Sequence, residues 1–98
     1  MTGWVIGVMV ELAGEPAPLR HYYAVGFEDR AKAEWTALDA AMSLGNITSS
    51  PFKGQEPVQA LAQLSLARMK KLGLLDREVR ALGRTWPRKW LDLSLIHI

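Results

Sequence analysis

Two stretches near the N-terminus place apolar side chains at every second position, and this alternation limits the chain to a fold that begins with strands. The first stretch, residues 3–12, reads GWVIGVMVEL. The second, residues 19–28, alternates in the same way through His21, Tyr23 and Val25. A period of two with many β-branched and aromatic residues is typical of strands that bury one face. The linking AGEPAP holds two prolines, which a central strand excludes, so we predict a β-hairpin with a long loop.

The segment after the hairpin has a helical period. Asp29 is a good N-cap, because its carboxylate can accept the unpaired N–H groups of a first helical turn. Gly45 can end the helix, since glycine adopts the left-handed conformation without a steric penalty. We predict a helix over residues 29–44 with one apolar stripe that covers the hairpin. The stripe comprises Ala31, Trp35, Leu38 and Met42.

The second half of the chain fits two alternatives. Residues 57–73 form either one helix or a strand over 58–64 followed by a short helix that Ser65 caps. We favour the helix, because Ala, Leu and Gln are better helix formers than strand formers. Residues 75–82 also have helical spacing, and a short strand through 79–82 is the alternative there.

The elements together predict an α+β fold: an N-terminal antiparallel β-hairpin followed by an amphipathic helix and further short helices. One extra short strand, at residues 47–49, is an option. A hairpin alone is marginal in water and needs a cover, and a chain of 98 residues allows one small domain, here 1–92. The predicted core contains Trp4, Ile6, Val8, Val10, Tyr23, Val25, Phe27, Trp35, Leu38, Met42, Leu61 and Leu72.

The last six residues, LSLIHI at 93–98, resemble the in-frame translation of a transposase adapter end used in sequencing libraries. That adapter reads CTG TCT CTT ATA CAC ATC, and all six residues of its translation match residues 93–98. A genuine apolar C-terminal strand is the alternative. We expect residues 93–98 to be an adapter-derived tail, so that His97 carries no functional information and the natural protein continues beyond Asp92.

The sequence offers no motif for catalysis or cofactor binding. It contains no cysteine, no G-x-S-x-G, no P-loop and no G-x-G-x-x-G. His21 is the only histidine before the tail, and a lone histidine on an apolar strand face more often packs than catalyses. We therefore expect no enzyme, no cofactor and no metal site.

Because the sequence has no catalytic or cofactor motif, we expect the chain to act by binding another protein or a second copy of itself. The edges of the hairpin could pair with a strand of the partner. No apolar run approaches the ~20 residues of a membrane-spanning helix, and the N-terminal run lacks the basic start of a signal peptide. We expect a cytoplasmic protein that binds no membrane.

Nucleic-acid binding is the alternative function, because the charge is uneven. Residues 1–50 hold three basic and six acidic residues, whereas residues 51–98 hold nine basic and four acidic ones. Basic side chains neutralise phosphates, and indole rings stack on bases. The segment 68–90 would supply the contacts. The candidates are Arg77, Arg80, Arg84, Trp86, Arg88, Lys89 and Trp90.

Two resemblances accompany these patterns. LLDREVRAL, at residues 74–82, resembles the opening of the helices in helix-turn-helix activators of the response-regulator type. The following GRTWPRKWL departs from that pattern with a proline and two tryptophans, so no DNA-contact residue carries over. The composition and the hairpin-then-DRAKAEW layout resemble short bacterial proteins of unknown function from high-GC genomes, which implies no activity.

Overall fold

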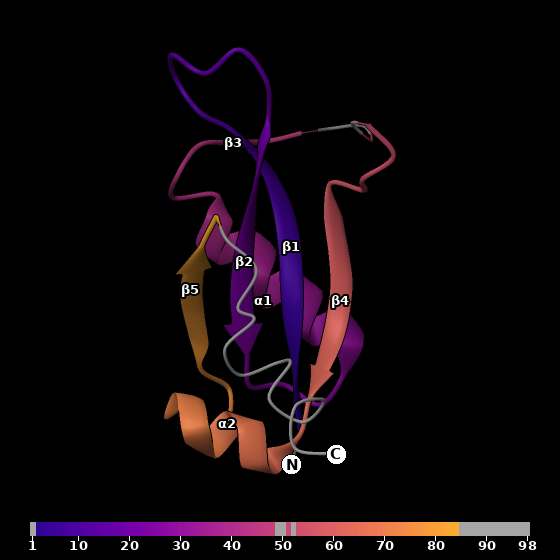
Figure 1. The fold of residues 1–98 in the computed structure, drawn as a ribbon, viewed down its shortest axis with the longest axis vertical. Helices are drawn as coiled ribbons and strands as arrows, with labels where there is room; N and C mark the ends of the chain where they lie inside the picture. Colours follow the sequence, from indigo (N-terminus) through magenta and orange to yellow (C-terminus); the bar gives the residue numbers. More distant parts are fainter. Residues whose placement is uncertain (1, 49–50, 52, 85–98) are drawn as a thin grey trace, which may run out of the picture.

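The computed structural model describes residues 2–48, 51 and 53–84. Within these residues the fold is α+β, with a five-stranded antiparallel sheet and two helices (Figure 1). In chain order the elements are β1 (Gly3–Glu11), β2 (Leu19–Val25), α1 (Arg30–Ala41), β3 (Asn46–Ile47), β4 (Val58–Leu64), α2 (Leu66–Leu72) and β5 (Val79–Gly83).

β1 is the central strand, and it is hydrogen-bonded along both edges. One edge pairs with β2, with Trp4 opposite Val25 and Val10 opposite Leu19. The other edge pairs with β4 and, at its end, with β3. β2 pairs in turn with β5, so β4 and β5 flank the hairpin, α1 lies behind the sheet and α2 lies at one end of it (Figure 1). The expectation that the hairpin edges are free for a partner is wrong, because β4 and β5 occupy them.

The hairpin and the first helix follow in the predicted order, although β2 ends at Val25 and α1 at Ala41, each three residues before its predicted end. Asp29 caps α1, and one of its carboxylate oxygens accepts a hydrogen bond from the backbone N–H of Lys32 at 3.1 Å. The predicted role of Gly45 is wrong, because this glycine does not adopt the left-handed conformation. A Cβ at position 45 would instead collide with the carbonyl oxygen of Glu11. Gly45 therefore lets the chain pass close to the end of β1.

The predicted helices over 57–64 and 79–82 are wrong, because both segments are strands. β4 occupies the first and β5 the second, as the alternatives proposed. Ser65 then caps α2, and its hydroxyl accepts a hydrogen bond from the backbone N–H of Arg68 at 3.2 Å. The outer edges of β1 and β2 present backbone N–H and C=O groups that need hydrogen-bond partners. Pairing with these edges outweighs the helix propensity of the segments that form β4 and β5.

α1 packs on the sheet through alanines and not through its large side chains. Trp35 is 67% exposed and Met42 is 60% exposed. The prediction that this stripe covers the hairpin is therefore wrong, although Leu38 is half-buried. Alanine has no side chain beyond Cβ, so the helix lies close to a sheet whose own side chains fill the core. The buried alanines are Ala33, Ala37 and Ala41.

The sheet buries side chains on both faces. Of the remaining predicted core residues, Trp4, Phe27, Leu61 and Leu72 are half-buried, whereas Ile6, Val8, Val10, Tyr23 and Val25 are buried. A second cluster, on the face opposite α1, was not predicted from the sequence. This cluster contains Val5, Ala24, Leu64, Met69 and Leu74.

Both outer strands carry a bulge. In β4, Leu61 is the extra residue between the pairs that Ala60 and Ala62 make with β1. In β5, Leu82 is the extra residue between Ala81 and Gly83, which pair with β2. A bulge bends its strand and is one of the devices that keep an exposed sheet edge from pairing with another chain. The edges of this sheet are therefore poor sites for strand addition.

The alanine contact predicts unequal effects on stability for two similar substitutions in α1. Ala37→Leu should lower the free energy of unfolding by about 1–3 kcal/mol, because the larger side chain overpacks the buried helix–sheet contact. Ala31→Leu is the matched control on the exposed face, and Trp35→Ala is a second one. Both should stay within about 0.5 kcal/mol of the wild type in urea unfolding followed by circular dichroism. A large loss with Trp35→Ala would contradict this packing.

Tyr23 predicts a loss of stability at alkaline pH. Burial raises the pKa of its phenol above the ordinary value of 10.0. At pH values below 10 the phenol of Tyr23 is neutral in the folded and in the unfolded state. As the pH rises above 10, the phenol loses its proton in the unfolded chain before it does so in the folded protein. The free energy of unfolding should therefore fall as the pH rises toward the folded-state pKa, by up to about 1.4 kcal/mol per pH unit. Urea unfolding of Tyr23→Phe should lack this component, and the Tyr22→Phe control should keep it.

Candidate functional site

The basic segment predicted to contact nucleic acid is only partly described. Trp86, Arg88, Lys89 and Trp90 lie outside the described residues. Arg84 is exposed just after β5. The structure thus tests where Arg77 and Arg80 lie, and it leaves the nucleic-acid hypothesis a prediction for the rest of the segment.

Arg80 joins β5 to the end of α2. Its guanidinium donates hydrogen bonds to the carbonyl oxygens of Leu72 and Gly73, the latter at 3.3 Å, and forms an ion pair with Glu78 at 3.4 Å. The last carbonyls of a helix lack partners within the helix, and a cation there is favourable. This structural role has no signal in the sequence, because the contact joins residues of two elements.

Arg77 lies in the loop before β5, and this loop is hydrogen-bonded to the residue that follows β2. Arg77 adopts a left-handed conformation with φ of 64°, and its backbone N–H donates to the carbonyl oxygen of Gly26 at 2.7 Å. The backbone N–H of Gly26 donates in turn to the carbonyl oxygen of Glu78, also at 2.7 Å. A Cβ at position 26 would collide with the carbonyl oxygen of Leu75, so glycine permits this close approach.

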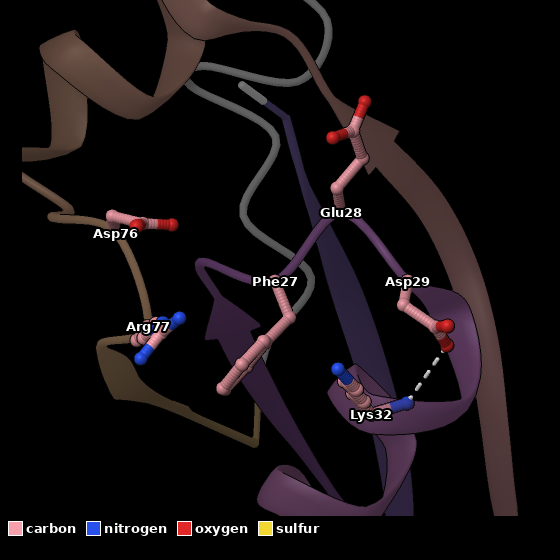
Figure 2. A pocket seen from close by; sticks show the side chains of 6 residues that line it. All are labelled: Phe27, Glu28, Asp29, Lys32, Asp76 and Arg77. Carbon is pink, nitrogen blue, oxygen red and sulfur yellow. Dashed lines mark hydrogen bonds between the residues drawn. The ribbon is translucent and has the colours of Figure 1, made fainter.

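A charged hollow of about 420 Å³ lies beside this loop. Figure 2 shows its lining, which comes from the β2–α1 connection, the first turn of α1 and the loop before β5. All five charged side chains are exposed, and Asp29 is already engaged in capping α1. The hollow therefore has no desolvated polar group that could recognise a ligand. Its lining residues are Phe27, Glu28, Asp29, Lys32, Asp76 and Arg77.

His21 and Tyr22 do not form a common site. They are neighbours in β2 and so point to opposite faces of the sheet, His21 opposite Val8 and Tyr22 opposite Gly7. His21 is buried, and its Nδ1 lies 3.3 Å from the carbonyl oxygen of Leu19. The described residues contain no group of three or more His, Asp or Glu side chains that could hold a metal ion.

The large apolar side chains of α1 form an exposed surface with the start of β4. We call this surface the α1–β4 face. It contains a hollow of about 230 Å³, which Trp35 and Leu38 line together with Val58 and Glu34. Its apolar members are Ala31, Trp35, Leu38, Met42 and Val58.

The sequence contains a pattern that could have indicated this face, because α1 has two apolar stripes. One stripe is made of large residues and the other of Ala33, Ala37 and Ala41. Hydrophobicity alone favours burial of the large stripe, and the structure buries the small one. The stripe that was predicted as core is therefore the candidate interaction surface.

Comparison of the chain with protein-family models, with curated proteins and with solved structures found no match in any of the three. Neither helix in the described part of the chain is long and apolar enough to cross a membrane.

The position of Arg80 predicts a structural effect. Arg80→Gln should lower the free energy of unfolding by about 1 kcal/mol, because it weakens the contacts between β5 and the end of α2. Arg84→Gln is the control and should leave stability unchanged, since Arg84 is exposed and forms no hydrogen bond or ion pair within the described part of the chain. Equal effects of the two substitutions in urea unfolding would contradict the capping role of Arg80.

Proposed function

We propose that this chain is a non-catalytic protein-interaction module that binds its partner through the α1–β4 face. The observation that carries the proposal is the orientation of α1, which buries alanines and leaves Trp35 67% exposed. Tryptophan is among the residues that most often dominate binding at protein interfaces. A helix that presents such a side chain to water has a ready docking surface.

The chemistry of the α1–β4 face fits a protein partner. Trp35, Leu38 and Val58 line a shallow apolar hollow, and Met42 continues the stripe by one further turn. An aromatic ring that becomes buried removes a large apolar area from water. Methionine adapts its shape to an opposing surface. A helical stripe of this kind is the pattern by which helices dock against apolar grooves or other helices.

Other modes of action have less support in the described residues. Strand addition is disfavoured, because β4 and β5 each carry a bulge. Catalysis lacks a convergent set of polar groups, since His21 and Tyr22 face opposite sides of the sheet and the charged hollow is solvated. The α1–β4 face is thus the surface on which the proposal rests.

A photo-crosslinking experiment in the native host tests this proposal. Benzoylphenylalanine replaces Ala31, a small residue of the α1–β4 face, and the control places it at exposed Lys71 on α2. We expect a discrete adduct, identified by mass spectrometry, from position 31 and not from position 71. Adding Trp35→Gln should remove the adduct. The absence of any adduct from position 31, or an adduct that ignores Trp35→Gln, would overturn the proposal.

A further inference from the structure

We infer that the partner of the α1–β4 face is a second copy of this chain, bound through an antiparallel pair of α1 helices. This inference rests on the proposed function, because it uses the same face. It depends on two charged residues that border the apolar stripe. Lys32 precedes Trp35 by three positions, and Asp39 follows it by four.

Helix geometry places the two charges on the same flank of the stripe. With 3.6 residues per turn, Lys32 and Asp39 lie about 60° and 40° around the helix from Trp35, in the same direction. With a rise of 1.5 Å per residue, Lys32 lies about 4.5 Å before Trp35 along the axis and Asp39 about 6 Å after it. A cation and a carboxylate therefore stand at nearly equal distances on either side of the tryptophan.

This layout is complementary to itself under a two-fold axis. If two α1 helices meet face to face and antiparallel, with the axis near Trp35, Lys32 of each copy lies opposite Asp39 of the other. The same contact forms twice, as in any interface that uses one patch on both subunits. The two Trp35 rings meet near the axis, where aromatic pairs add to the gain from buried area. A parallel pair would instead set this flank of one helix against the opposite flank of its partner, so that Lys32 and Asp39 would not meet.

Both charged groups are available for these contacts. Among the described residues, neither the ammonium of Lys32 nor the carboxylate of Asp39 has an ion-pair partner, and both side chains are exposed. Asp29 binds the backbone N–H of Lys32 and not its side chain. Lys32 lines the charged hollow of Figure 2, and its long side chain can turn from there toward a partner helix. Glu34 lies on the other flank, about 100° from Trp35.

The size of the face sets the strength of the dimer. α1 has 12 residues and is thus about 18 Å long. A contact along one such helix buries less than the ~800 Å² per partner of a standard stable interface. We therefore expect a weak dimer that forms as the protein concentration rises, and not an obligate one.

Sedimentation equilibrium of the full 98-residue chain over a range of concentrations tests the inference. The wild type should show a reversible monomer–dimer equilibrium, and Trp35→Ala should raise the dimer Kd about tenfold or more. Lys32→Asp alone and Asp39→Lys alone should each raise the Kd about fivefold, because each replaces attraction by repulsion at both symmetric contacts. The double variant Lys32→Asp/Asp39→Lys should restore dimerisation.

The charge reversals should not destabilise α1, because they place an acidic residue in its first turn and a basic residue near its end, where each interacts favourably with the helix dipole. Lys71→Asp, on α2, is the control and should leave the Kd unchanged. A monomer at every concentration, a dimer that ignores Trp35→Ala, or a double variant no better than the singles would overturn the inference. If the chain is a monomer but the photo-crosslinking experiment still gives an adduct with another protein from position 31, only the self-association is overturned. If position 31 gives no adduct, the proposed function is overturned as well.

Discussion

The hydrogen bonding of β1 along both edges is the constraint on which the rest of the structure depends. β2 pairs with one edge of β1, and β4 and β3 pair with the other. β5 joins the sheet through β2. Both faces of β1 are then buried, from Val5 through Val10. A strand buried on both faces needs a cover on each, and α1 provides one of these covers, while α2 contributes Met69 to the cluster on the other face.

The fit of α1 on this sheet explains why its large side chains face outward. Ile6, Val8 and Tyr23 already fill the space between the layers, so the helix can approach only with small residues. Interiors are close-packed, and an added large side chain would force the layers apart. The outward direction of Trp35 therefore follows from the size of the side chains on the sheet, and it leaves the exposed helical stripe on which the α1–β4 face is built.

The parts of the fold that the sequence predicts are those with local signals. The alternation in residues 3–12 and 19–28 and the cap at Asp29 act within a few residues, so the sequence predicts the order of the hairpin and α1 but not their ends. β4 and β5 depend on the free edges of β1 and β2, which are distant in the chain, so local propensity favours helices there. The candidate face was missed for a related reason, because the choice between two stripes of α1 depends on the volume of the sheet residues. The role of Arg80 likewise requires the end of α2 beside it.

The two sides of α1 divide between the stability of the fold and the recognition that we propose. Its three buried alanines contribute to the core, whereas Trp35 and Met42 leave apolar area in water and add little to the folding free energy. An exposed apolar stripe favours association, and the direction of that association depends on the polar groups around it. Lys32 and Asp39 supply such groups without taking part in the helix–sheet contact. In the proposed dimer the same helix fixes the fold with one side and selects an antiparallel partner with the other.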